Sequence, residues 1–474
     1  MKFSWSIISI ISRFFAVAIG LVQSVIIVKL LTVSDYGLVG LVTSIAAIVG
    51  VYQNLGISSG STREIAAAKN KDEAFKVFIG STIVRYIISL PLVLGLFIFA
   101  PYLGNIYYHR PEIINPLRIF SLILFIQALQ SVLNSVIQGT KQFKFLFIFQ
   151  SAISIVSIII YIPFLIEYGY VGYFYALLVF NIISTFILGI YVLKVFFGHL
   201  VLPNAKELKS IVASVFKIGL FVYFIKIIFM QWQKLGPVLL GKDLSDEMLG
   251  VFSFALLVAS KITTISDAVT DVTLPSMTSV FEKSRHEFKD VFLNSNAKAY
   301  FLILFSSVFL IIFKFEIFQF VDFVFNFIGK DPITTRYVDA FKLMDPLILA
   351  FWAYSHINLL KSGVAVPARK LWGALISYAL MFLLTVAIYY AYGFSDSLMW
   401  FSVAMGLGGL VAYIVFIFFI KKEVGFYPIT KGDIVYTLLS LLLLIGYYLN
   451  QSHWILGLVY LAISYVLYKK VYSK

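Results

Sequence analysis

The amino-acid sequence predicts an all-α, polytopic membrane protein with about fourteen transmembrane helices. Of its 474 residues, 61% are hydrophobic and 13% are charged, and its mean hydropathy is +0.96. Soluble chains are closer to half apolar and a quarter charged. Apolar runs of about 20 residues recur along the chain, which is the length that an α-helix needs to cross a bilayer. An outer-membrane barrel would instead need segments of about ten residues with strict alternation, so a helical bundle is expected.

The expected spans follow one another with short connections. They are residues 7–31, 36–57, 78–103, 117–138, 146–167, 170–194, 211–235, 249–275, 297–321, 343–363, 371–393, 396–420, 434–450 and 453–471. The first run is too long for a signal-peptide core and has no small-residue cleavage site, so we expect a retained span. The chain contains no cysteine, which excludes disulfides and thiolate chemistry.

Lysine and arginine in the connections predict the orientation. If the N-terminus is cytoplasmic, most of the basic residues between spans fall on the cytoplasmic side. The opposite face then holds only Arg110, Lys234, Lys242, Lys330, Arg336 and Lys342. We therefore expect both termini in the cytoplasm. The net charge of +14 is explained by this topology and by contact with anionic lipid, so it does not indicate a nucleic-acid partner.

The longer cytoplasmic connections are amphipathic. In SGSTREIAAAKNKDEAFKVF, residues 59–78, Ser61 or Thr62 can cap a helix that lies on the inner leaflet. Its apolar residues, expected to face the lipid, are Ile65, Ala68, Phe75 and Phe78. The segment PNAKELKSIVASVF before the seventh span has the same character.

The chain also contains an internal repeat. KLLTVSDYG (residues 29–37) and KDLSDEMLG (residues 242–250) both read K-x-L-x5-G, at an offset of 213 residues, and each leads into a new span. This spacing predicts two six-helix units in the same orientation, followed by a last pair of helices. The expected boundaries are 1–205, 206–425 and 426–474. Parallel repeats place a substrate path between the two halves.

The DYG turn, the segment GKDLSDEMLGVFSFA, the link QGTKQFKF and the fourteen-span layout together resemble the polysaccharide (Wzx-type) flippases of the multidrug/oligosaccharidyl-lipid/polysaccharide (MOP) exporter superfamily. The resemblance implies two lobes around a cavity that opens alternately to each side of the bacterial cytoplasmic (inner) membrane. It implies transport of lipid-linked oligosaccharides, commonly on undecaprenyl pyrophosphate, for O-antigen or other surface polysaccharides. Membrane lipids, a glycan polymerase and chain-length proteins are the further partners implied, and no cofactor is expected.

Four of the basic residues within the expected spans are candidates for a functional site: Arg13, Arg85, Lys226 and Lys261. Lys226 is about 13 Å from either end of its helix, where a cation facing lipid would cost several kcal/mol. With the resemblance, a cationic cavity for a pyrophosphate is the functional interpretation. Pairing with a carboxylate or snorkelling is the structural alternative. Lys217 and Lys234 lie near the ends of the same span and can snorkel to water.

Two further polar sets lie within spans. Asp267 and Asp271 are one helical turn apart and could couple an ion or form a gate, or could pair with Lys261 or Lys226; Asp345 and Glu316 are other acids within spans. Span four carries a polar stripe whose carboxamides suit sugar hydroxyls, with interhelical hydrogen bonding as the alternative. The stripe consists of Gln127, Gln130, Asn134 and Gln138.

The sequence contains no metal-ligand spacing, phosphate-binding loop, nucleophile elbow or catalytic carboxylate pair, so we do not expect an enzyme. Two rivals remain. A multidrug exporter of the same superfamily would need acidic residues in the first lobe, but span one has none and the charges within spans are mainly basic. A membrane glycan polymerase or glycosyltransferase would need a large loop or a catalytic domain, and the outer connections are short.

Overall fold

The computed structural model describes residues 5–392, 397–449 and 453–469, with side chains for these except 5–17, 216–222, 271–276 and 285–286. All regular structure in this part is helical, without a β-strand. Nine of its helices or helix runs are long and apolar enough to cross a membrane. The protein is a multi-pass membrane protein, as the sequence predicts.

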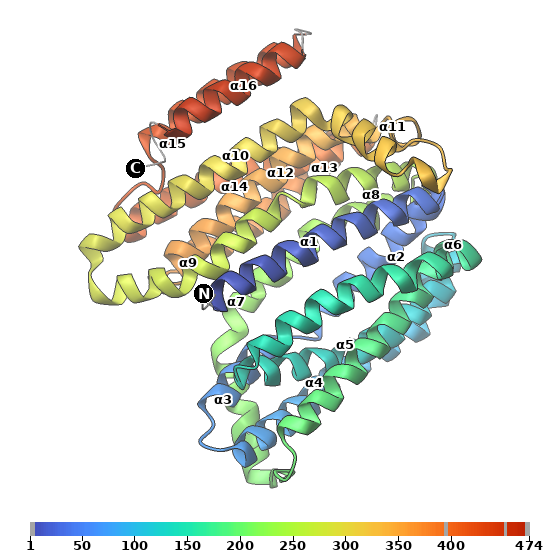
Figure 1. Ribbon diagram of the computed structural model, residues 1–474, viewed down its shortest axis with the longest axis vertical. Helices are drawn as coiled ribbons and strands as arrows, with labels where there is room; N and C mark the ends of the chain where they lie inside the picture. Colours follow the sequence, from blue (N-terminus) through green and yellow to red (C-terminus); the bar gives the residue numbers. More distant parts are fainter. Residues whose placement is uncertain (1–4, 393–396, 450–452, 470–474) are drawn as a thin grey trace. The chain divides into compact units, whose positions relative to one another are not determined.

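The chain forms two compact units, Met1–Gly250 with Ile328–Lys330, and Val251–Phe327 with Asp331–Lys474. Figure 1 shows α4, α5 and α6 side by side in unit 1. The helices of unit 1 are α1 (Trp5–Leu30), α2 (Val33–Tyr52), α3 (Ile57–Ala67), α4 (Lys71–Pro101), α5 (Ile114–Gly139), α6 (Phe143–Val195) and α7 (Ala205–Leu240). The expected spans 146–167 and 170–194 both lie in α6, which reverses at Gly169 because that residue has non-helical backbone angles (φ 56°, ψ −135°).

Unit 2 is built around α12, which packs against α9, α10 and α14, while the C-terminal pair α15 and α16 packs on α10 (Figure 1). The helices that follow α7 are α8 (Asp246–Ser260), α9 (Thr263–Lys283), α10 (Arg285–Val324), α11 (Ile333–Arg336), α12 (Ala340–Leu360), α13 (Trp372–Tyr392), α14 (Ser397–Val424), α15 (Lys431–Tyr448) and α16 (His453–Leu467). The single span expected over 249–275 is divided, because α8 ends at Ser260 and α9 begins at Thr263.

α7 packs against α2, α3 and α4 and so belongs to unit 1, although the repeat places it in the second six-helix unit. Its first turn is held by a capping box between Asn204 and Glu207. Lys76 of α4 donates a 2.6 Å hydrogen bond to Glu207, and this bond lowers the pKa of that carboxyl. The connection between the sixth and seventh spans is therefore tied to the end of α4.

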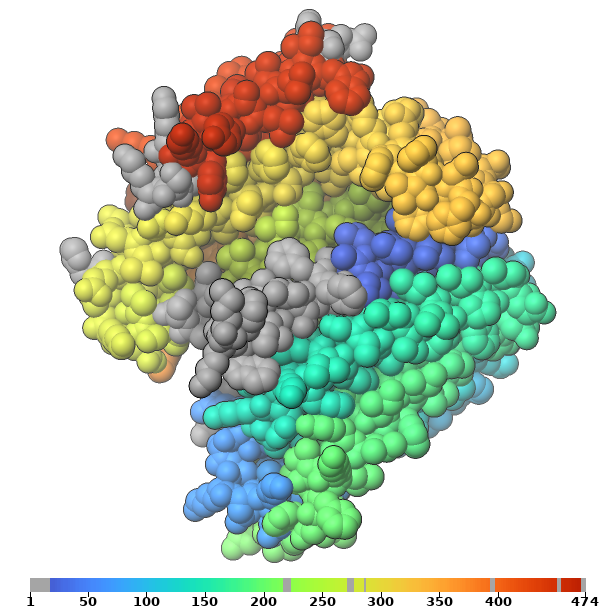
Figure 2. Space-filling view, in the orientation of Figure 1, coloured from blue at the N-terminus to red at the C-terminus, as the bar shows by residue number. Residues whose placement is uncertain are grey.

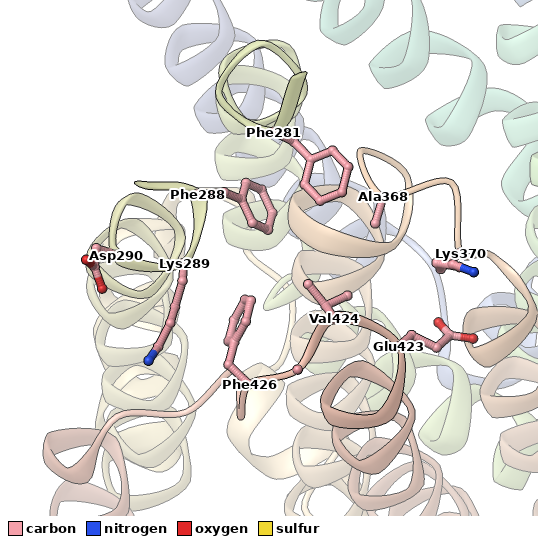
Figure 3. A pocket seen from close by; sticks show the side chains of 10 residues that line it. Phe281, Phe288, Lys289, Asp290, Ala368, Lys370, Glu423, Val424 and Phe426 are labelled. Carbon is pink, nitrogen blue, oxygen red and sulfur yellow. The ribbon is translucent and has the colours of Figure 1, made fainter. Parts of the chain in front are cut away.

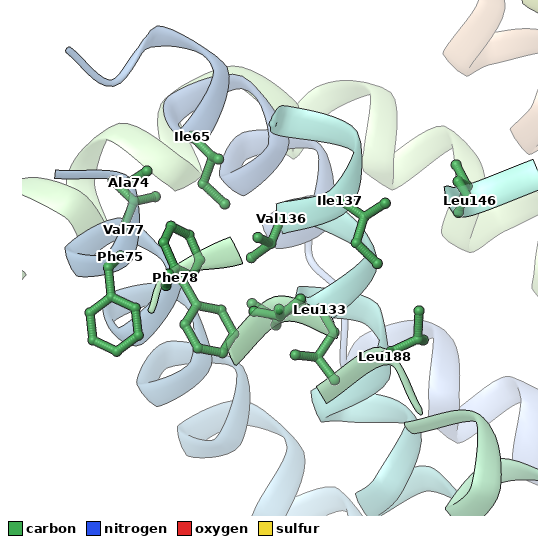
Figure 4. Close-up of a cluster of buried hydrophobic side chains, with 13 residues drawn as sticks. Ile65, Ala74, Phe75, Val77, Phe78, Leu133, Val136, Ile137, Leu146 and Leu188 are labelled. Carbon is green, nitrogen blue, oxygen red and sulfur yellow. The ribbon is translucent and has the colours of Figure 1, made fainter. Parts of the chain in front are cut away.

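The amphipathic connection after α2 differs from its expected placement. Ile65, Phe75 and Phe78 do not face lipid; they are buried against residues of α5 and α6 (Figure 4). Ser61 does not cap a helix start, because α3 already begins at Ile57 and the Ser61 hydroxyl bonds the carbonyl of Ile57. The apolar face that the sequence revealed is real, but it covers other helices.

The lipid-facing surface of unit 1 is clearest on α6, which forms much of the face of that unit visible in Figure 2. Ile148, Ile155, Ile159 and Ile166 of this helix are 47–68% exposed. Their spacing of seven, four and seven residues places them on one face of a helix. Exposure of a stripe of isoleucine side chains to water is unfavourable, whereas their contact with the hydrocarbon of a bilayer is favourable.

The two copies of the repeated motif touch each other within unit 1. A Cβ on Gly37 would meet the carbonyl of Asp246, and a Cβ on Gly250 would meet the carbonyl of Val33. Residues 33 and 246, like 37 and 250, are 213 positions apart, so the contact is reciprocal. The two helix starts, of α2 and α8, therefore have equivalent surroundings and approach as closely as only glycine permits.

Candidate functional site

Arg85 and Lys226 form what we call the cationic centre of unit 1. Arg85 lies in the middle of α4 and is 4% exposed. Its Nη1 donates a 2.7 Å hydrogen bond to the carbonyl of Gln53, just past the end of α2. The hydroxyl of Tyr223 on α7 donates to the neighbouring carbonyl of Val51. Carbonyls at a helix C-terminus carry partial negative charge, so Arg85 is held by a helix end instead of a carboxylate.

Lys226 lies one turn beyond Tyr223 on α7 and is close enough to Arg85 for the two charges to interact. Its side chain is exposed and forms no hydrogen bond or ion pair with a described residue. Acidic residues of α1 to α7 occur only in the first turns of helices, at Glu64 near the end of the short helix α3, and at Glu167, beside the reversal of α6. Two cations therefore lie at mid-span positions without an acidic partner among the residues that the structure describes.

Arg13, the third cationic candidate of this half, lies in α1, but its side chain is outside the described residues. The same is true of Lys217 on α7. The contribution of Arg13 to the centre and the snorkelling of Lys217 to water both remain predictions.

The polar stripe on α5 is close to the cationic centre. Gln53, whose carbonyl binds Arg85, also donates from Nε2 to the carbonyl of Leu124 on α5, 3.4 Å away, and the stripe starts one turn further on. Three of its carboxamides are partly exposed and that of Gln138 is exposed. None of the four has a hydrogen-bond partner among the described residues, whereas Ser135 beside them bonds α3 through the carbonyl of Ser58. Interhelical bonding is thus carried by the serine and not by the carboxamides.

In unit 2, Lys261 lies at the break between α8 and α9. Its carbonyl accepts hydrogen bonds from the backbone N–H and the hydroxyl of Thr264, and the hydroxyl of Thr263 bonds the carbonyl of Ser260. Hydroxyl groups thus satisfy the backbone where the helix is interrupted, as broken transporter helices require. The ammonium of Lys261 forms no ion pair with a described residue, so its expected pairing with Asp267 is not formed.

Asp267 belongs to a different network. Its Oδ1 accepts a 2.9 Å hydrogen bond from Nδ2 of Asn358 on α12, and Oδ1 of Asn358 accepts one of 2.7 Å from Lys361. The ammonium of Lys361 also lies 5.6 Å from the centre of the Tyr378 ring. The side chain of Asp271, the other proposed coupling residue, is outside the described part. A role for either aspartate in coupling remains a prediction.

The other two acids that were singled out within spans contact basic side chains. Asp345 binds Lys314 of α10 and accepts a 2.9 Å hydrogen bond from Tyr448 of α15. Glu316 lies 2.7 Å from Nε2 of His453. Lys314 was not singled out from the sequence, although a lysine inside an apolar span is itself the signal. Gln53, just past the end of α2, and Tyr223, in the middle of α7, gave no such signal, because both are uncharged.

Comparison with known proteins assigns the family. Residues 26–322 match the model of the polysaccharide biosynthesis proteins. The chain belongs to this family. None of the curated protein sequences is significantly similar to it.

Solved transporters share the fold of this polysaccharide biosynthesis protein. A lipid II flippase, MurJ, in an inward closed conformation matches with a TM-score of 0.74 and 15% identity over 98% of this chain and 99% of that chain. An inward-facing multidrug resistance MATE family transporter of the MOP superfamily matches with a TM-score of 0.67 and 16% identity, over 86% of this chain and 94% of that chain. A MOP superfamily transporter from Pyrococcus furiosus, described as having a binding pocket of reverse polarity, matches with a TM-score of 0.52 and 16% identity. The match covers 88% of this chain and 94% of that chain. The predicted polytopic helical fold is confirmed, and in its fold the chain is similar to transporters of the MOP superfamily.

Proposed function

We propose that the protein is a flippase that moves an oligosaccharide linked to an undecaprenyl pyrophosphate-type lipid across the bacterial cytoplasmic membrane by alternating access. Its product would serve O-antigen or another surface polysaccharide, and both of its termini would be cytoplasmic. The observation that carries the proposal is the pair of mid-span cations, Arg85 and Lys226, which form no ion pair with a carboxylate in the described part of the chain.

A diphosphate suits this pair chemically. Arginine presents paired N–H donors to phosphate oxygens, and lysine adds a compact charge. The Nε of Arg85 is buried without a hydrogen-bond partner, so part of the guanidinium's donor capacity is unused. An anion that replaced this missing partner would stabilise the centre.

The carboxamide stripe suits the sugar part of such a substrate. Carboxamides donate and accept hydrogen bonds, as sugar hydroxyls do. Leaving them unpaired in hydrocarbon would cost several kcal/mol each. A hydrated substrate path beside α5 is the environment in which four such groups can remain without protein partners.

A multidrug exporter is the second candidate, because a MATE transporter has a similar fold. Export of cationic amphiphiles calls for acidic groups where the substrate binds, and the interior of the unit 1 spans is basic. A glycan polymerase is the third candidate function. If the protein were a polymerase, the lipid-linked sugars of a deletion strain would already be on the outer side of the membrane.

Deletion in the source organism separates these functions. In inverted and right-side-out vesicles, periodate, which does not cross membranes, reports the leaflet that holds the lipid-linked sugar. We expect deletion to trap the sugar in the cytoplasmic leaflet. Sugar already in the outer leaflet would indicate a polymerase, and unchanged glycan with lost efflux of cationic dyes would indicate the exporter.

Variants returned to the deletion strain then test the site. Lys226→Ala, Arg13→Ala and the double change Gln130→Leu/Asn134→Leu should reduce outward sugar at least tenfold while protein levels stay normal. Lys194→Ala, at the exposed end of α6, is the matched control and should transport normally. Normal transport by both Lys226→Ala and Arg13→Ala would overturn the cationic site.

A further inference from the structure

Unit 2 contains a hollow of about 430 Å³ at one end of its helices. Its walls come from the end of α9, the start of α10, the link between α12 and α13, and the link between α14 and α15. Figure 3 shows Phe281, Phe288 and Phe426 around the hollow, with Lys289 and Glu423 on opposite sides of it. The volume lies within the range of small-ligand sites.

The charges around this hollow are balanced and unpaired. Two are positive, Lys289 and Lys370, and two are negative, Asp290 and Glu423. None of the four forms a hydrogen bond or ion pair with a described residue. Lys370 and Lys422 are near enough to attract the carboxylate of Glu423 but form no ion pair with it. Charges of both signs around one hollow match a ligand that carries both signs itself.

The carboxylate of Glu423 requires a hydrogen-bond donor from the positive group of the ligand. Its Oε2 is buried and has no hydrogen-bond donor. A buried carboxylate oxygen without a donor is costly, and an N–H from a cation removes that cost. A primary ammonium supplies N–H donors, whereas a quaternary ammonium supplies none.

The position of the hollow at the ends of membrane helices indicates that its ligand is a lipid. It lies where α9 and α14 end and α10 begins, and Trp372 and Tyr427 near its rim are 65% and 46% exposed. Aromatic and lysine side chains at helix ends mark the level of lipid headgroups. The three phenylalanine rings offer an apolar wall to the glycerol and the first acyl carbons.

We propose that this hollow binds the headgroup of an aminophospholipid, with the primary ammonium on Glu423 and the phosphate on Lys289. The site is distinct from the cationic centre of unit 1 and does not depend on the transported substrate. It makes the protein selective for a membrane lipid through one hydrogen-bonding carboxylate.

The purified full-length protein tests this selectivity without any substitution. Native mass spectrometry after incubation with equal amounts of phosphatidylethanolamine and phosphatidylcholine compares headgroups that differ only in the N-methyl groups. We expect phosphatidylethanolamine to be retained about tenfold more, the factor typical of a hydrogen bond to a charged group. Equal retention would overturn the proposal. A preference for phosphatidylcholine would also overturn it and would assign selectivity to the phenylalanine rings as a cation–π site.

Two variants locate the contacts. Glu423→Gln should remove the preference between the two lipids, and Lys289→Gln should lower the retention of both alike, because both carry the phosphate. Glu282→Gln and Lys283→Gln, on exposed residues at the end of α9 that do not line the hollow, are the matched controls and should behave as the native chain. An unchanged preference in Glu423→Gln would refute the assignment of the ammonium.

A competition experiment distinguishes a membrane lipid from a soluble compound with the same headgroup. Free glycerophosphoethanolamine carries the same ammonium and phosphate but no acyl chains. If the ligand is a membrane lipid, this soluble compound in hundredfold excess should displace little phosphatidylethanolamine. Complete displacement at equal concentration would refute a lipid and indicate a soluble aminophosphate.

Discussion

At the scale of single residues, two arginines of unit 1, the buried Arg85 and the partly buried Arg110, have different surroundings. Arg110 binds the carboxylate of Asp246 and the carbonyls of Gly241 and Leu244, so all of its major contacts are within the protein. Arg85 has one carbonyl partner and an unused Nε. The first arrangement is that of a structural residue, and the second leaves binding capacity for a ligand.

This contrast predicts opposite outcomes for one substitution. Arg110→Met should lower the free energy of unfolding by about 2 kcal/mol or more, because it leaves a carboxylate and two carbonyls without their donor. Arg85→Met should leave stability unchanged or higher, since replacing a buried charge by an apolar side chain of similar size is often neutral. Thermal unfolding in detergent measures both. If Arg85→Met were as destabilising as Arg110→Met, Arg85 would be structural.

Sequence reasoning located the charges within spans better than it located their partners. A cation in an apolar run is visible in the sequence because its cost in lipid is large. The partner of Arg85 is a backbone carbonyl at Gln53, and the partner of Asp267 is Asn358, 91 residues away. Neither contact has a periodicity or a composition that marks it, since both arise from how helices pack.

At the scale of helices, hydropathy predicted where the spans lie and the reversal at Gly169, which falls between the expected spans 146–167 and 170–194. It did not predict the break at Lys261 inside the expected span 249–275, because that break depends on local backbone hydrogen bonding within apolar sequence. The amphipathic connection at α3 was assigned to the lipid surface because amphipathicity alone does not identify what covers an apolar face. Its burial against α5 and α6 required the tertiary structure.

The reciprocal glycine contact predicts matched effects at the two copies of the motif. Gly37→Ala and Gly250→Ala should each destabilise the protein by about 1–3 kcal/mol or more, because the new methyl group meets a backbone carbonyl that cannot move alone. Gly95→Ala on α4, with nothing near its Cβ position, is the control and should be neutral or slightly stabilising. Thermal unfolding in detergent compares the three. Tolerance at one motif glycine only would show that the two copies are not equivalent.

At the scale of the whole molecule, the order of spans and the distribution of charge constrain each other. Each helix that crosses the membrane moves the chain to the other side, and lysine and arginine collect where the connections are cytoplasmic. The outer connections after α4 and α7 contain Arg110 and Lys242, but Arg110 is bound to Asp246 and Lys242 lies 5.8 Å from the centre of the Tyr107 ring. Arg110 and Lys242, on the expected outer side, are thus both engaged by other residues of the protein.

This topology predicts the side of each connection. From a cytoplasmic N-terminus, α1 and α2 return the chain to the cytoplasm before Lys69, α4 carries it outside before Glu112, and α5 with the two halves of α6 returns it before Lys206. Reporter fusions after Lys69, Lys206 and Lys474 should therefore report the cytoplasm, and a fusion after Glu112 should report the outside. Alkaline phosphatase and green fluorescent protein, which are active on opposite sides of the membrane, provide complementary readouts. A C-terminal reporter on the outside would require an odd number of crossings and would refute the fourteen-span arrangement, whereas a Glu112 reporter in the cytoplasm would place the error within the first three spans.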